Sequence, residues 1–205
     1  MPFDTDVGAR AYELARVLFP LPRSLVSRAN MRTNDILCEE ISVPVTRMKI
    51  PSGTEIGGWE VPHEWAIRDA FIQHLPSGHK FAQFRNLNLH VVGYSEPVDQ
   101  IMSLEELEPR IFTQPDQPDW VPYVTSYYKK TWGFCMSERE KKELPLGDYR
   151  VIIDSELFDG EMLYADALIP GESEQEIFFS SYLYHPSMAN NELSGPVLFA
   201  ALMQH

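Results

Sequence analysis

Near its C-terminus the chain reads Ile177-Phe-Phe-Ser-Ser-Tyr-Leu-Tyr-His-Pro-Ser-Met-Ala-Asn-Asn-Glu-Leu-Ser-Gly-Pro-Val-Leu-Phe-Ala-Ala-Leu-Met-Gln204. Residues 177–184 are a nearly continuous apolar run, typical of a strand buried on both faces in a parallel α/β sheet. The run ends in His185-Pro186, and the small and polar residues 187–195 indicate a loop. Pro196 favours the first turn of a helix, where its missing N–H costs no hydrogen bond. This region therefore predicts a strand, a loop and a helix in that order.

His185 is the candidate functional residue of this region. It follows the predicted strand directly, and open α/β sheets bind their ligands at the carboxyl ends of the strands. Histidine serves as a metal ligand or a general base, and the polar loop behind it is rich in Asn, Ser and Glu. A surface histidine without chemistry is the alternative that position alone leaves open.

Helical spacing dominates the N-terminal part of the chain. Val7, Ala11, Leu14 and Leu18 recur on one helix face, and Pro20 follows them. A second helix is expected over residues 24–40. The composition changes near residue 42, where short strands and turns begin.

The middle of the chain is predicted to be β-rich. Strands are expected at 65–72, 81–84, 87–92, 149–157 and 161–169, with residues 76–80 as one hairpin turn and Asp159-Gly160 as another. Capping boxes at Ser103–Glu106 and Ser137–Glu140 each predict the start of a short helix.

Charge and cysteine content limit the class of protein. The 205 residues contain 17 Lys and Arg against 30 Asp and Glu, a net charge of −13. Such a chain lacks the basic surface that nucleic acids and anionic membranes attract, so we expect neither as a partner. Two cysteines, Cys38 and Cys135, could form only one disulfide, which is too few to stabilise a secreted chain of this size. No signal peptide or membrane span is recognisable. We therefore expect a cytoplasmic protein.

Several longer runs carry a family resemblance. One is Tyr184-His-Pro-Ser-Met-Ala-Asn-Asn-Glu-Leu-Ser-Gly-Pro196, and the others are Pro51–Pro62, Trp65–Ala70, Leu89–Ser95, Pro122–Tyr128, Trp132–Cys135, Ile153–Glu156 and Ile169–Ser173. Together they resemble a bacterial aminopeptidase-like family of the DUF4910/DUF2172 type, whose members look like zinc aminopeptidases of the M28 type. The resemblance covers nearly the whole chain.

The resemblance implies an α/β fold, in which part of an M28-like peptidase sandwich is interrupted by an inserted β-rich domain. Residues 1–42 would be the N-terminal helices of the peptidase-like domain and 43–169 the inserted domain. Residues 170–205 would be the first, truncated part of the peptidase-like α/β core. Because the inserted domain takes more than half of the chain, we expect the catalytic domain to be incomplete.

The same resemblance implies a zinc site with His185 as its first ligand. In M28 peptidases a bridging aspartate lies in an Ala-Asn-Asp-Asn-x-Ser-Gly pattern, and Asn191 stands at that position here. A carboxamide supplies one neutral oxygen and binds a dication more weakly than a carboxylate does. Ser187 stands in the place of the acidic residue that follows the first histidine in those peptidases, whereas Glu192 offers a carboxylate one position beyond Asn191. We therefore expect one or two zinc ions held by His185 and Asn191.

Different functions follow from these features. The leading hypothesis is an aminopeptidase-like zinc metallohydrolase that acts on a peptide or amide substrate. Formation of a homo-oligomer is left open. The alternative is a non-catalytic accessory module with a degenerate metal site, which binds a carbohydrate or a protein. A third reading is a fragment without function, whose unpaired strand edges and apolar faces would be exposed.

Two further groups of residues have alternative readings. An aromatic set could form a carbohydrate-binding face or fill the core of the β-rich region; it consists of Trp59, Trp65, Trp120, Trp132, Tyr123, Tyr127 and Tyr128. Asp154 and Glu156 are two residues apart and face the same side of a predicted strand. They could form an acid/base pair or belong to a solvated face.

Overall fold

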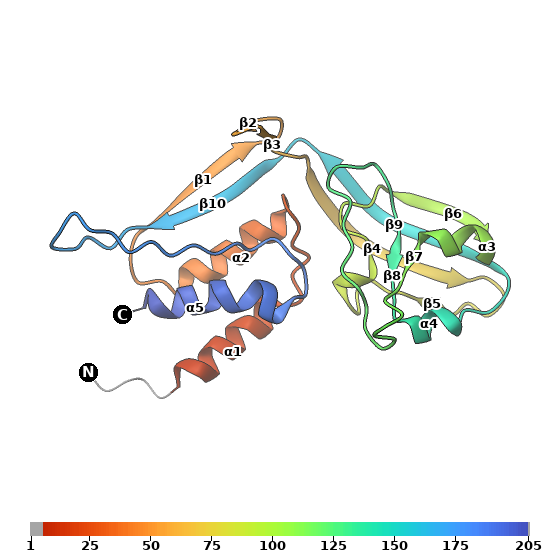
Figure 1. The fold of residues 1–205 in the computed structure, drawn as a ribbon. Coiled ribbons are helices and arrows are strands. Elements are labelled where there is room, and N and C mark those ends of the chain that lie inside the picture. The colour runs from red at the N-terminus through yellow and green to blue at the C-terminus, as the bar shows by residue number, and fades with distance from the viewer. Residues whose placement is uncertain (1–5, 205) are drawn as a thin grey trace. The chain divides into compact units, whose positions relative to one another are not determined.

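The structure is a computed structural model that describes residues 6–204 (Figure 1). The chain divides into two compact units, unit 1 and unit 2. Unit 2 is the continuous segment Trp65–Phe158, and unit 1 comprises the residues up to Glu64 and from Asp159 onward. Helices and strands both occur, so the predicted mixed α/β class is confirmed.

Helices α1 (Val7–Leu18), α2 (Arg28–Glu39) and α5 (Ser194–Leu202) pack together in unit 1 (Figure 1). The buried residues that they share are Leu18, Leu37, Leu193, Val197 and Ala200. Ala11 and Leu14 pack against this cluster from the apolar face of α1. The helical spacing of the N-terminal residues therefore predicted the correct element and its buried side.

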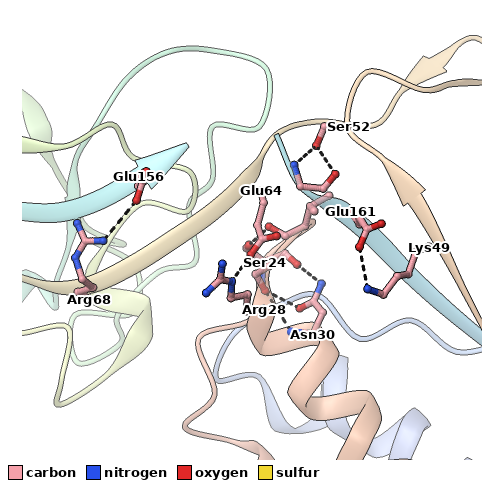
Figure 2. A network of polar contacts seen from close by, with 12 residues as sticks. Ser24, Arg28, Asn30, Lys49, Ser52, Glu64, Arg68, Glu156 and Glu161 are labelled. Atoms are coloured by element: carbon pink, nitrogen blue, oxygen red, sulfur yellow. Dashed lines mark hydrogen bonds and ion pairs between the residues drawn. The ribbon is translucent and has the colours of Figure 1, made fainter. Parts of the chain in front are cut away.

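Helix α2 begins at Arg28 rather than at residue 24, because a polar turn precedes it. The Ser27 hydroxyl caps the helix by accepting a hydrogen bond of 3.3 Å from the backbone N–H of Asn30. The Asn30 side chain donates to the Ser24 carbonyl at 2.6 Å (Figure 2). Ser24 is thus held in the turn outside the helix.

A long antiparallel pair of strands completes unit 1. Strands β1 (Val45–Pro51) and β10 (Glu161–Ala167) run from Val45 opposite Ala167 to Pro51 opposite Glu161. The shorter strands β2 (Glu55–Ile56) and β3 (Trp59–Glu60) form a hairpin. Its two loop residues, Gly57 and Gly58, both have positive φ angles, as the tight turns that match the strand twist require.

Unit 2 is built on a sheet with the strand order β5-β4-β9-β6. The strands are β4 (Glu64–His74), β5 (Lys80–Phe81), β6 (Val98–Ser103) and β9 (Asp148–Phe158), of which β4 takes its first residue from unit 1. A second, parallel pair consists of β7 (Ile111–Phe112) and β8 (Phe134–Cys135). Helices α3 (Leu104–Leu107) and α4 (Glu138–Lys142) begin at the predicted caps, where Ser103 and Ser137 accept from the backbone three residues later.

Ser95 is buried and forms hydrogen bonds with residues of several motifs that suggested the family resemblance. Its carbonyl accepts hydrogen bonds from Trp65 Nε1 at 3.0 Å and from the Ser155 hydroxyl at 2.8 Å. Its hydroxyl accepts from the Gly133 backbone N–H at 3.3 Å. A Cβ on Gly133 would lie 2.9 Å from the Arg110 carbonyl, so only glycine fits there. These motif residues are therefore explained by the packing of unit 2.

The predicted strand at 177–184 is wrong. The segment has no strand pairing with any part of the chain that the structure describes, and Phe178 is 87% exposed. An apolar run becomes a strand only where another strand satisfies its backbone groups, and neither sheet pair of unit 1 extends to this segment. A peptidase-type sandwich built on this strand stays a prediction.

The hairpin predicted at Asp159-Gly160 is also wrong, because its two strands belong to different sheets. Strand β9 pairs with β6 in unit 2, whereas β10 pairs with β1 in unit 1. Gly160 serves close packing instead, because a Cβ there would overlap the Cβ of Glu64. Residues 87–92, predicted as a strand, contain the 3₁₀ helix Asn88–His90.

The domain boundaries at 42/43 and 169/170 stay predictions, and the two compact units of the structure are a separate division of the chain. The division falls after Glu64 and after Phe158. Strands β1 and β10 belong to unit 1 because they pair with each other and β10 contacts helix α2.

The side chain of Glu64, the last residue of unit 1 before the chain enters unit 2, is buried. Its Oε1 lies 3.5 Å from Arg28 Nε, at the start of α2 (Figure 2). Beside it, the Gly160 backbone N–H donates to the Ser52 hydroxyl at 3.0 Å. Burial raises the pKa of Glu64 from 4.5, while the charge and backbone N–H of Arg28 oppose the rise and the charge of Glu161 adds to it.

Glu64→Gln is expected to remove one pH-dependent contribution to stability. A raised native pKa means that the folded state binds the proton more tightly than the unfolded state. The contribution of Glu64 is therefore fully present below pH 4.5 and is lost as the pH rises through its native pKa. Urea unfolding at several pH values should show the variant gaining stability relative to the wild type as the pH rises. A difference that does not change with pH would contradict this assignment.

Candidate functional site

The region around His185 is held in an unusual backbone conformation. Ser187 has a φ of +44°, which is strained for a residue other than glycine. A single π-helical turn, Ala189–Leu193, follows and continues into α5. Such turns in otherwise α-helical segments often occur at functional sites. The sequence predicted a loop here, and the structure replaces most of it with this turn.

The structure brings His185 and Asn191 into direct contact. His185 Nδ1 lies 2.8 Å from Asn191 Oδ1. A carboxamide oxygen only accepts hydrogen bonds, so Nδ1 carries the proton and donates it. In the neutral ring the lone pair is then on Nε2, the nitrogen able to bind a metal or accept a proton. The rings of Tyr184 and Tyr182 pack edge-on against the imidazole, with centroids 4.3 Å and 5.6 Å away.

Glu192 lies behind the imidazole and is only 1% exposed. Its Oε2 is 3.4 Å from His185 Nδ1, and neither carboxylate oxygen has a full hydrogen-bond partner among residues 6–204. Burial raises the pKa of Glu192 to about 7, although the backbone amides of His185 and Tyr184 and the charge of Arg23 oppose the rise. The buried carboxyl group thus lies beside the same ring nitrogen that Asn191 contacts.

Arg23 is the residue of this site that the sequence did not reveal. Its fully buried side chain donates from Nε to the His185 carbonyl at 3.2 Å and from Nη1 to the Leu18 carbonyl at 2.5 Å. Burial lowers the pKa of Arg23 to about 10, against the opposing charge of Glu192. Because 162 positions separate Arg23 from His185, no local spacing could have joined them.

The described residues do not make a complete zinc site. Catalytic zinc takes three protein ligands, and residues 6–204 hold no cluster of three or more His, Cys, Asp or Glu side chains suited to a metal. His185 offers one nitrogen, Nε2, whereas Asn191 contacts the ring at its other nitrogen, Nδ1. Ser187 donates to the Phe19 carbonyl at 3.4 Å. The ligand roles expected for His185 and Asn191 stay predictions.

Asp154 and Glu156 lie on the exposed face of unit 2 and share one cation. The Arg68 guanidinium donates from Nε to both carboxylate oxygens of Asp154 at 2.9 Å (Arg68 and Glu156 are drawn in Figure 2). Glu156 lies 3.7 Å from the same guanidinium. Arg68 lowers the pKa of Asp154, which keeps it ionised. This arrangement favours the solvated ion-pair reading over an acid/base pair.

The aromatic residues of unit 2 divide into buried and exposed members. Trp65 is buried and stacks on Tyr94 with a centroid distance of 6.0 Å. The Arg110 guanidinium lies over the Trp132 ring, with Arg110 Cζ 4.9 Å from the ring centroid. Trp120 and Tyr128 are largely exposed. The core reading therefore applies to Trp65, whereas Trp120 and Tyr128 lie at the surface.

Within residues 6–204, none of the helices combines the length and apolar character that a membrane crossing needs.

Comparison with known proteins connects both units to peptidase-like proteins. Residues 64–156 match the family model described as a domain of unknown function, DUF2172. A Clostridium acetobutylicum protein named "Putative polysaccharide biosynthesis protein with aminopeptidase-like domain" is 42% identical over 194 residues. The crystal structure of a "putative peptidase" from the same species superposes with a TM-score of 0.93 at 41% identity.

These similarities cover almost all of this chain but only part of each relative. They include 95% of this chain and 44% of the curated protein, and 97% of this chain and 46% of the crystallised one. The chain therefore spans less than half the length of the relatives that it matches. Over nearly its whole length it is similar to part of proteins described as aminopeptidase-like or as peptidases, with a DUF2172 match at residues 64–156.

Proposed function

We propose that this chain is part of an aminopeptidase-like zinc hydrolase of peptides or amides, to which it contributes His185 as a zinc ligand. The single observation that carries the proposal is the 2.8 Å contact between His185 Nδ1 and Asn191 Oδ1. Metal-binding histidines typically donate their other ring N–H to an oxygen acceptor, which fixes the tautomer and the ring orientation. The similarity to proteins described as aminopeptidase-like supports the reaction class.

In this proposal Asn191 orients His185 rather than replacing a bridging carboxylate. Its amide oxygen is occupied at Nδ1, and Glu192 Oε2 lies 3.4 Å from the same nitrogen. Both would make Nε2 a stronger donor to zinc. The chemistry that zinc supplies to hydrolases is a bound water of lowered pKa and a polarised carbonyl.

We also propose that the catalytic set within this chain is incomplete. Residues 6–204 supply fewer acidic and histidine ligands than a catalytic zinc site takes. More than half of each relative's length lies outside the matched region, which is where the further ligands would be sought.

Replacing His185 with alanine is expected to lower zinc binding by at least about tenfold, since the loss of even an outer-shell partner costs 10–100-fold. Zinc per chain is measured by mass spectrometry after dialysis against a fixed free-zinc concentration. His79→Ala is the matched control, because His79 lies on an exposed turn of unit 2 and should leave the zinc content unchanged. If the His185→Ala variant still binds one zinc ion per chain, His185 is not the ligand.

Hydrolysis of leucine p-nitroanilide tests the second part of the proposal separately. We expect no His185-dependent turnover by this chain alone. Turnover that disappears in His185→Ala but not in His79→Ala would refute the incomplete set while supporting the ligand.

A non-catalytic carbohydrate-binding role is the second candidate. The exposure of Trp120 and Tyr128 favours it, since exposed aromatic rings stack on sugars. The name of one relative includes polysaccharide biosynthesis. A zinc-free chain that is retarded in gels containing polysaccharide, and released by Trp120→Ala, would favour this role over hydrolysis.

A further inference from the structure

Arg23 is a fully buried cation in unit 1, at the point where three segments meet. It reaches the C-terminal end of α1 through the Leu18 carbonyl and the candidate site through the His185 carbonyl. The third segment is the π-helical turn, whose Glu192 acts on Arg23 through its charge. Burying a guanidinium costs several kcal/mol before its partners are counted, whereas an apolar side chain of similar size would fill the same space without that cost.

We propose that Arg23 is the positioning residue of this site, which fixes His185 from the backbone side through the His185 carbonyl. The inference rests on the proposed role of His185 as a ligand. It extends that role to a residue far away in the sequence, whose contacts are to the carbonyl of His185 and not to its ring.

The geometry of arginine suits this task. Its planar fork presents N–H groups in fixed directions, so two simultaneous hydrogen bonds define the position of the His185 carbonyl relative to α1. The carbonyl at the C-terminus of α1 also carries the negative end of the helix dipole, which favours a cation there. Lysine would keep the charge but lose the fixed directions.

The segment after His185 depends on such an external anchor. Ser187 has a positive φ, and the π-helical turn begins only at Ala189. The ring itself is held at Nδ1 by Asn191 and faces Glu192 there. With the backbone anchored by Arg23 and the ring by Asn191, Nε2 points in one direction. Loss of the first anchor should therefore let the ring leave Asn191.

The test reads the His185 tautomer in the zinc-free chain by two-bond 1H–15N correlation spectra of the labelled imidazole. In the wild type we expect the Nδ1–H form. Arg23→Met should mix the two tautomers and weaken zinc binding by about 10–100-fold. Arg23→Lys should restore part of both effects. Arg16→Met is the control, because Arg16 is exposed on α1 and its guanidinium pairs with the neighbouring Glu13.

Each outcome decides the proposal. Folded Arg23 variants, judged by circular dichroism, with an unchanged tautomer and unchanged zinc affinity would overturn it. If Arg23→Met does not fold, Arg23→Lys and Glu192→Gln are read in the same spectra, and unchanged tautomers in both would likewise overturn it. If the tautomer shifts but no form of the chain binds zinc through His185, the proposed function fails and the positioning role stands.

Discussion

Phe134→Ala is expected to lower the free energy of unfolding of unit 2 by about 3–5 kcal/mol. Phe134 is fully buried on β8, where its backbone pairs with Ile111 and bridges to Val91. Removal of the ring loses the transfer free energy of the side chain and leaves a cavity that the surrounding strands fill only in part. A loss of this size approaches the whole stability of a small domain, about 5–15 kcal/mol.

The measurement is urea unfolding followed by tryptophan fluorescence, with Trp65 as a reporter inside the core of unit 2. Phe178→Ala makes the same chemical change at a side chain that is 87% exposed, and it should cost less than about 0.5 kcal/mol. Equal costs at the two positions would show that Phe134 is not part of a packed core.

We expect the chain to self-associate through its exposed apolar segment 177–184, and replacing both Ile177 and Phe178 with serine should weaken this association by about a hundredfold. Both side chains are exposed on the unpaired segment 177–184, together with Phe179 and Tyr182. Burying each large apolar side chain contributes about 1.5 kcal/mol or more, and about 3 kcal/mol corresponds to two orders of magnitude in a dissociation constant. Sedimentation velocity over a range of concentrations measures the change.

Leu146→Ser is the matched control for this experiment, because Leu146 is 89% exposed but lies alone on a turn of unit 2. It should leave the association unchanged. A wild-type chain that stays monomeric at every concentration would remove the segment as an association surface. The same conclusion would follow if Leu146→Ser had an equal effect.

Local patterns in the sequence predicted the elements that are marked by a short-range spacing of residues or by a cap. Ala11, Leu14 and Leu18 recur on one face of α1, and the serines before α3 and α4 cap the next turn of backbone. The segment 177–184 shows the limit of such patterns. Its apolar run indicates what would be favourable to bury, but the identity of a pairing strand is a property of the rest of the molecule.

The pair Asp159-Gly160 shows the same limit in another form. A turn signal between two strand patterns does not say whether the strands pair with each other, and β9 and β10 pair with β6 and β1 instead. Within the candidate site, His185 and Asn191 were identified from neighbouring residues in one motif, and the structure places them 2.8 Å apart. Arg23 had no such signal, because its role depends on a contact across most of the chain.

The close packing of Glu64 and Gly160 brings the two ends of unit 2 together. The residues that precede and follow unit 2 are neighbours in space: a Cβ on Gly160 would meet Glu64, and His63 Nδ1 lies 2.9 Å from Asp159 Oδ1. A domain whose two ends meet can be lengthened, exchanged or deleted without moving the scaffold that carries it. The chain therefore leaves unit 1 after Glu64 and returns to it at Asp159, beside the same point.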